Sequence, residues 1–193
     1  MMELKVSEWK EFKIGRLYDR IVSCKCDNAS SLDDGDDINY IGAKWNENGV
    51  MNRVALDSAL VSQGNCVVFI LQGEGSAGKA TYQPDDFIGA TSLRCGYIDG
   101  ILNPLIGNFL ATCHSLEKPK YNHGRGWGRT LSDTIVRLPI QYDASGQPVI
   151  DPNKKYSDDG YVPDWDFMEQ YMKSLNHSSP TTNRGVQISY SWC

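Results

Sequence analysis

Short blocks of apolar and polar residues along the 193-residue chain predict both strands and helices. Phe12 and Ile14 alternate with polar residues, and apolar positions at helical spacing follow them, so residues 9–22 predict a strand that leads into a helical turn. Residues 38–41 predict a second short strand. The uninterrupted apolar run at residues 65–71 predicts a strand that is buried on both faces.

Two helices are predicted from their first residues. Asn103 followed by Pro104 is typical of a helix start, with Asn as the N-cap and Pro at the first helical position. The apolar face of this helix is expected to reach Leu116. Asp164 predicts the cap of a helix over residues 164–175. Strands and helices without a regular βαβ order favour an α+β fold, with a mixed twisted β-sheet and a few short helices.

The segments between these elements are polar. Residues 23–37 predict an aspartate-rich loop, residues 130–135 a helical turn, and residues 141–163 a surface excursion. Residues 176–193 are rich in Ser, Thr and Asn and predict a polar C-terminal tail. We therefore expect a single domain over residues 1–175, with a short C-terminal helix, followed by this tail.

A glycine-rich stretch after the apolar run imitates a nucleotide-binding loop. Residues 73–79 have the spacing Gly-x-x-x-x-Gly-Lys and contain Gly-x-Gly-x-x-Gly. A P-loop needs a hydroxyl after its lysine and a helix that begins there, but Ala80 follows the lysine and Pro84 comes soon after. We therefore expect a hairpin of residues 66–71 and 79–83 joined by a glycine-rich turn. A nucleotide-binding enzyme using Gly73 to Lys79 is the weakest interpretation.

Charge is unevenly distributed along the chain, although its net value of −5 and a mean hydropathy of −0.43 are ordinary for a globular protein. Aspartates gather in residues 27–37 and 143–166. Residues 118–129 carry Lys118, Lys120, Arg125 and Arg129 and no acid, together with glycines and aromatic residues. This mixture is typical of a loop that contacts phosphates and stacks on a base or sugar, and a solvated surface is the plainer alternative.

The sequence predicts a cytoplasmic protein. The N-terminal residues are charged throughout, without the apolar segment of a signal peptide, and no run approaches the ~18 apolar residues of a membrane span. Cys66 and Cys113 lie inside apolar runs and are expected to be buried free thiols. Cys24 and Cys26 lack a second pair at zinc-site spacing, so no metal site is expected.

Four stretches occur in an order and spacing that are specific when taken together. They are WKEFKIGRLY at residues 9–18, GSAGKATYQP and FIGA at residues 75–90, YNHGRGWGRTL at residues 121–131, and LPI, GQP and PDWDFME at residues 138–169. Over residues 8–175, the chain resembles the target recognition domain of the DNA-specificity subunits of type I restriction-modification systems. It is most similar to the variety fused to, or partnered with, bifunctional restriction-methylation enzymes.

This resemblance implies a protein without catalytic activity that reads one half of a bipartite target in double-stranded DNA. It implies a methyltransferase subunit as partner, with a restriction nuclease subunit as a further one, and S-adenosylmethionine would belong to the methyltransferase. Family members usually have two recognition domains joined by long helices, or one domain followed by a long helix. This chain has one domain and a short helix, which suggests a half-subunit that dimerises, a truncated or phage-borne version, or a module that works alone.

Side chains able to make paired hydrogen bonds in the major groove are the candidates for reading DNA, because Arg and Lys favour guanine there and Asn and Gln favour adenine. The candidates are Lys44, Asn46, Asn48, Ser76, Lys79, Gln83, His123, Arg125, Trp127 and Arg129. On the helix over residues 164–175, Tyr171, Met172 and Leu175 are the candidates for a partner or self-interface. No catalytic or metal-binding residue is expected.

The net charge keeps a second interpretation open. An interaction or decoy protein, borne by a phage or mobile element, would bind restriction-modification subunits without reading DNA. The five aspartates in residues 27–37 suit this alternative, because they would repel a phosphate backbone.

Overall fold

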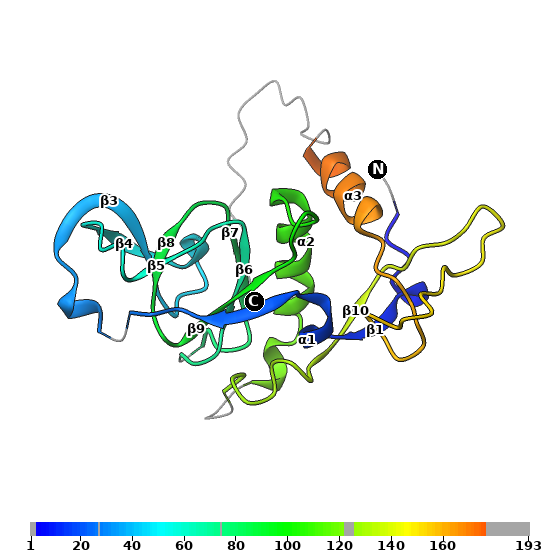
Figure 1. The fold of residues 1–193 in the computed structure, drawn as a ribbon, viewed down its shortest axis with the longest axis horizontal. Coiled ribbons are helices and arrows are strands. Elements are labelled where there is room, and N and C mark those ends of the chain that lie inside the picture. Colours follow the sequence, from blue (N-terminus) through cyan, green and yellow to red (C-terminus); the bar gives the residue numbers. More distant parts are fainter. Residues whose placement is uncertain (1–2, 27, 74, 122–125, 177–193) are drawn as a thin grey trace, which may run out of the picture.

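The computed structural model describes residues 3–26, 28–73, 75–121 and 126–176 of the chain. These residues form an α+β fold, as predicted, and their strands make three sheets (Figure 1). The strands are β1 (Lys10–Lys13), β2 (Arg20–Ser23), β3 (Asp34–Ile41), β4 (Val50–Val54), β5 (Val61–Ser62), β6 (Cys66–Ile70), β7 (Ala80–Gln83), β8 (Phe87–Gly89), β9 (Leu93–Tyr97) and β10 (Ile135–Leu138). The helices are α1 (Ile14–Leu17), α2 (Pro104–Ser115) and α3 (Trp165–Asn176), with 3₁₀ turns η1 (Val6–Glu8), η2 (Ala29–Ser31), η3 (Glu47–Gly49) and η4 (Lys118–Lys120).

The central sheet is antiparallel and has the order β2-β9-β6-β7. All residues of β6 are buried, and their side chains alternate between two cores. Val67 and Phe69 belong to the core that α2 covers, whereas Cys66, Val68 and Ile70 belong to the core shared with the neighbouring sheet. An uninterrupted apolar run is what a strand covered on both faces requires, so this prediction is confirmed.

The second four-stranded sheet has the order β4-β3-β8-β5, in which β3 and β8 are parallel. The predicted loop over residues 23–37 is wrong at both ends, because β2 extends to Ser23 and β3 begins at Asp34. The acidic half of β3 is exposed, and Arg53 on the paired strand β4 binds Asp36. Pairing with β4 thus overrides the low strand propensity of aspartate.

The smallest sheet joins two strands that are distant in the sequence. β1 pairs with β10 from Lys10↔Leu138 to Lys13↔Ile135, and α1 follows β1 directly, as predicted for residues 9–22. Residues 130–135 form consecutive i→i+3 turns instead of a helix, since β10 already begins at Ile135.

The two long helices begin where their capping residues predict. The side-chain oxygen of Asn103 accepts hydrogen bonds from the backbone N–H groups of Leu105 (2.9 Å) and Ile106 (3.1 Å). The carboxylate of Asp164 accepts one from the N–H of Phe167 (2.9 Å). α2 packs between the central sheet and α3 (Figure 1). The apolar face of α2 ends earlier than predicted, because Leu116 follows the helix and is exposed.

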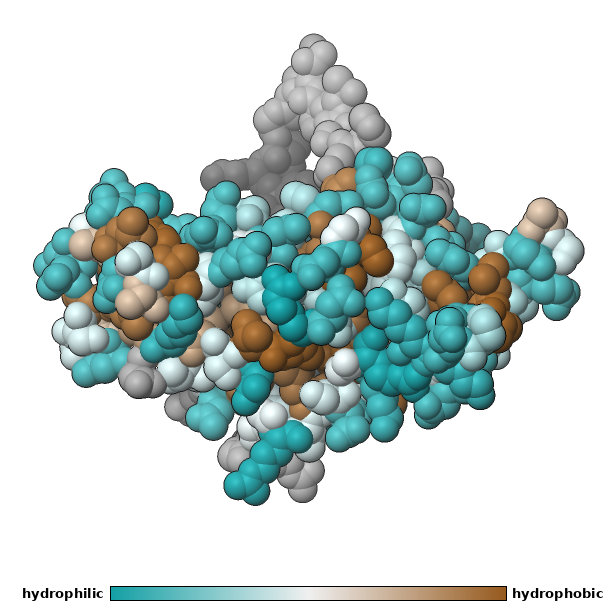
Figure 2. All heavy atoms as spheres, viewed as in Figure 1, coloured by the Kyte–Doolittle hydropathy of each residue, from teal (hydrophilic) through white to brown (hydrophobic). Residues whose placement is uncertain are grey.

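The surface mixes hydrophobic and hydrophilic side chains. On the face in Figure 2, hydrophobic residues lie in separate patches among hydrophilic ones. Cys66 and Cys113 are buried, as predicted, and burial raises the pKa of the Cys113 thiol to about 12. Within the described ranges, no helix is both long and apolar enough to cross a membrane.

Candidate nucleic-acid interface

The glycine-rich stretch is the turn of the β6–β7 hairpin. The register runs from Cys66↔Gln83 to Phe69↔Ala80, so the residues after Lys79 continue as a strand and not as a helix. Gly78 has φ +85°, and a Cβ there would lie 2.9 Å from both the Cα of Lys118 and the ring of Tyr121. The hairpin prediction is confirmed, and the turn lacks the helix that a P-loop needs to hold phosphates.

The turn and β7 support the neighbouring loop, residues 42–49, through two predicted DNA-reading residues. The buried hydroxyl of Ser76 donates to the carbonyl of Ala43 (2.8 Å). The buried amide of Gln83 donates to the carbonyl of Asn48 (2.6 Å), and the amide of Asn48 donates to the carbonyl of Tyr82 (2.9 Å). The sequence predicts that Ser76 and Gln83 contact DNA at the surface. The structure corrects this prediction, because both side chains are buried and position the 42–49 loop.

The supported loop presents the indole of Trp45, a residue that was not predicted to contact DNA. Trp45 is 60% exposed, and the ammonium of Lys79 lies 5.6 Å from the centre of its ring. Lys44 contacts the carboxylate of Glu47 and the carbonyl of Val50, which keeps its ammonium close to the loop. Asn46 is exposed at the tip. The signal available in the sequence was a lone tryptophan inside the turn-forming run KWNENG.

The basic segment lies along the other side of the glycine-rich turn. The backbone N–H of Trp127 donates to the carbonyl of Leu71 (2.8 Å), and Lys118 and Tyr121 pack against Gly78. Arg129 is exposed. The predicted contacts His123 and Arg125 lie outside the described residues.

Trp127 cannot stack on a base, because its side chain has no exposed surface. Its ring lies 5.3 Å from that of Tyr121 and 5.5 Å from that of Phe69, measured between ring centres. Its indole N–H donates to the hydroxyl of Thr134 (2.9 Å), which also bonds the Tyr121 hydroxyl (2.8 Å). The prediction for Trp127 is corrected: it fastens the basic segment to the central sheet.

A hollow of about 340 Å³ opens beside Trp45, between the 42–49 loop, β7 and α2. Its lining includes Lys79 and Asn48 as well as Asn108 and Thr112 on the exposed side of α2. No carboxylate is found among the described residues that line it. This hollow adjoins the candidate DNA-reading residues. Because Lys79 is the charged group in its described lining, it favours a negatively charged or neutral polar ligand.

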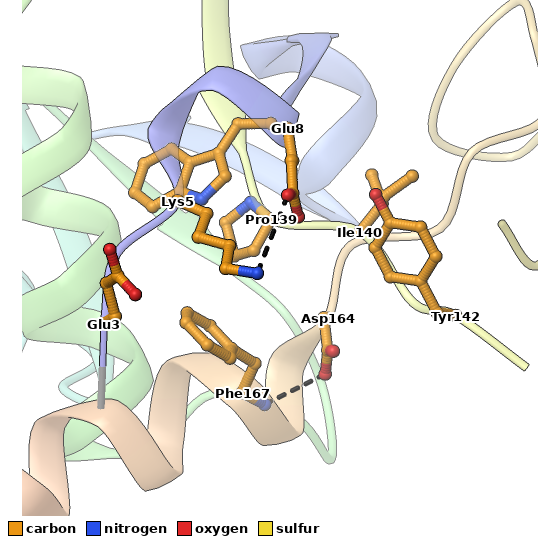
Figure 3. A pocket seen from close by; sticks show the side chains of 9 residues that line it. Glu3, Lys5, Glu8, Pro139, Ile140, Tyr142, Asp164 and Phe167 are labelled. Atoms are coloured by element: carbon orange, nitrogen blue, oxygen red, sulfur yellow. Dashed lines mark hydrogen bonds and ion pairs between the residues drawn. The ribbon is translucent and has the colours of Figure 1, made fainter. Parts of the chain in front are cut away.

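A second cavity, of about 250 Å³, lies between η1, β10 and the start of α3 (Figure 3). It is lined by Glu8, Pro139, Ile140 and Phe167 among others, and Lys5 pairs with Glu8 across 3.9 Å. Burial raises the pKa of Asp164, whose carboxylate caps α3. The carboxylate of Asp164 is therefore used by the helix as its cap.

The predicted interface residues on α3 differ in exposure. Tyr171 packs against Phe109 with ring centres 6.0 Å apart, so its ring belongs to the contact with α2. Met172 is half-buried and Leu175 is exposed. Nowhere in the described ranges do three or more His, Cys, Asp or Glu side chains gather as metal ligands would.

Comparison with solved structures shows the same fold in specificity subunits. The HsdS subunit from Thermoanaerobacter tengcongensis superposes with a TM-score of 0.52 at 12% identity, over 91% of this chain and 38% of that one. The S subunit of a type I restriction-modification system from M. genitalium superposes with a TM-score of 0.52 at 14% identity, over 89% of this chain and 41% of that one. A structure described as explaining complex assembly and conformational transition of the type I R-M system gives 0.53 at 12% identity, over 91% and 40%.

This chain therefore spans about two fifths of the length of these structures. No curated protein matches it in sequence. A family model does match, over residues 6–142, which is most of the chain, and that model describes the type I restriction modification DNA specificity domain. The hairpin with its glycine-rich turn and the whole basic segment, residues 118–129, lie inside this match. The chain belongs to the family of type I restriction modification DNA specificity domains.

Proposed function

We propose that this domain reads one half-site of a double-stranded DNA target and directs a partner methyltransferase to it, with a restriction nuclease as a further partner. The proposed recognition domain is residues 1–175, and residues 176–193 are its tail. S-adenosylmethionine would bind to the methyltransferase. A half-subunit of this kind would dimerise in the cytoplasm to read both halves of a two-fold symmetric target.

One observation carries the proposal. Residues of the 42–49 loop, the glycine-rich turn and residues 118–121 and 126–129 lie side by side along the β6–β7 hairpin. Loops held by a rigid sheet are where binding residues are usually placed, since the sheet fixes their geometry. The candidate surface therefore consists of Asn46, Lys79 and Arg129. The buried side chains of Ser76, Gln83 and Trp127 hold the segments that carry it.

The exposed side chains of this surface suit duplex DNA. A guanidinium or ammonium can bind phosphates or the acceptor edge of guanine, and an exposed amide can pair with adenine. Of the described acids beside this surface, Glu47 and Glu117 are each bound to a lysine. The aspartates of β3 lie in a different sheet, where Arg53 neutralises one of them.

Selection from random duplexes, with and without a methyltransferase subunit, tests this function. We expect one recurrent half-site to be enriched. A protein that binds the methyltransferase but enriches no sequence would be the decoy described above, and the proposal would be wrong.

The surface is tested on the selected duplex with Arg129→Gln and Lys79→Gln. A phosphate contact should weaken all sequences alike and lower the salt slope by about 1, whereas a base contact should cost ~1–3 kcal/mol at one position. Lys25→Gln, an exposed lysine on the segment after β2, is the matched control and should leave affinity unchanged. Equal behaviour of all three variants would remove this surface from the site.

A further inference from the structure

The hollow beside Trp45 has features that contact with a paired duplex does not explain. Bases inside a duplex show only their edges to a protein, whereas the indole of Trp45 offers a flat apolar face to solvent. Trp45 is 60% exposed, and the hollow of about 340 Å³ runs from it across β7 to α2. An aromatic face beside a recess is suited to a planar group that enters from outside.

The loop that carries Trp45 is held in place. Ser76 bonds the carbonyl of Ala43, and Gln83 bonds that of Asn48, so the loop is fixed on both sides of the indole. Glu47, Asn48 and Gly49 all have positive φ values, of 50°, 53° and 82°. The loop is thus held in one conformation, so the entropy lost when a ligand stacks on the indole should be small.

The charge of the hollow indicates what kind of ligand it takes. Lys79 lies over the Trp45 ring and has no carboxylate partner among the described residues. Asn108 and Thr112 add hydrogen-bond acceptors on the side of α2, since their own N–H and O–H groups donate to the carbonyls of Pro104 and Asn108. An aromatic face, an ammonium and neutral hydrogen-bonding groups together match the base, phosphate and sugar of a nucleotide.

We propose that the hollow takes up one nucleotide extruded from the bound duplex, with its base stacked on Trp45 and its phosphate bound by Lys79. The inference rests on the proposed DNA-reading function, because the duplex must already be bound at the adjoining surface. Extrusion breaks a base pair and its stacking, and stacking on the indole compensates for part of that cost.

An abasic-site walk along the selected duplex tests the inference in the full chain. Each base is removed in turn and binding is measured by fluorescence anisotropy. At one base pair, removal of the partner base should tighten binding by the wild-type protein, because no pair then has to be broken. Removal of the extruded base itself should make the wild-type protein and Trp45→Ala bind equally, because nothing then remains to stack on the indole.

Trp45→Ala should weaken binding of the intact duplex about 5- to 100-fold and abolish the tightening at that base pair, while Trp45→Phe should retain it. Ile150→Ala, which shortens another exposed apolar residue in the excursion before α3, is the control and should behave as wild type. The inference is overturned if no base pair shows this tightening, if Trp45→Ala keeps it, or if Trp45→Ala still binds more weakly than wild type when the extruded base is absent. Failure of the wild-type protein to bind any selected duplex would instead overturn the proposed function, and this inference with it.

Discussion

At the scale of single residues, side chains typical of DNA contact are divided between exposed contacts and buried supports. Ser76, Gln83 and Trp127 have the chemistry of base readers, but each is buried and spends its hydrogen-bonding groups inside the protein. Lys79 and Arg129, with ordinary surface chemistry, remain accessible. Residue type alone does not separate these roles, because burial depends on which segments of the chain meet.

The same substitution at two tryptophans should therefore have unequal effects on stability. Trp127→Phe removes buried volume and the hydrogen bond to Thr134, so we expect it to lower the free energy of unfolding by ~1–3 kcal/mol. Trp45→Phe, at an exposed position, should change it by less than about 0.5 kcal/mol. Urea denaturation measures both, and equal losses would contradict the assignment of Trp127 as a support.

A buried histidine should make stability depend on pH. Burial lowers the pKa of His114 to about 3, and its Nε2 bonds the Tyr18 hydroxyl at 2.7 Å. Between pH 6.5 and about 3, the unfolded chain binds a proton that the folded protein does not. Stability is therefore lost as the pH falls below 6.5, by up to ~1.4 kcal/mol per pH unit from this group.

Denaturation at several pH values, with His114→Gln as the comparison, isolates this contribution. The carboxylates titrate equally in both proteins, so the variant should show a shallower loss of stability below pH 6.5. Identical slopes would mean that His114 is protonated in the folded protein.

At the scale of elements, the features set by a few consecutive residues were predicted well, whereas those that depend on long-range pairing were not. The caps at Asn103 and Asp164 and the apolar run of β6 each lie within a few consecutive residues, and each element formed as predicted. The start of β3 at Asp34 depends on pairing with β4, which no local pattern shows. The meeting of the three candidate segments also depends on long-range contacts, so their proximity was not predictable from spacing.

Two substitutions on the helix α3 should separate its role in packing from a role in partner binding. Tyr171→Ala removes the ring that packs on Phe109 and should destabilise the fold by ~2–4 kcal/mol. Leu175→Asp, near the exposed end, should leave stability unchanged but weaken association with a methyltransferase or a second copy. Thermal melting, pull-down and size-exclusion mass measure the two effects. A Leu175→Asp protein with unaltered association would show that α3 only covers its own core.

At the scale of the whole molecule, charge is separated in space as well as in sequence. The acidic half of β3 lies in the sheet with β4, β8 and β5, whereas Lys79 and Lys118 lie at the β6–β7 turn. A net charge of −5 therefore does not describe the surface that a duplex would meet. Electrostatic attraction is set by the local distribution, and it should orient the domain as it approaches DNA.

The pairing of β1 with β10 sets when the protein can fold during its synthesis. Arg137 on β10 donates a hydrogen bond to the carbonyl of Trp9, 128 residues earlier. At ~5–20 residues per second, a ribosome needs about 6–25 s to make the intervening chain. During that time Phe12 and Ile14, which are fully buried in the folded protein, have no complete core to pack against. The nascent chain is thus a predicted client of ribosome-associated chaperones until β10 has emerged.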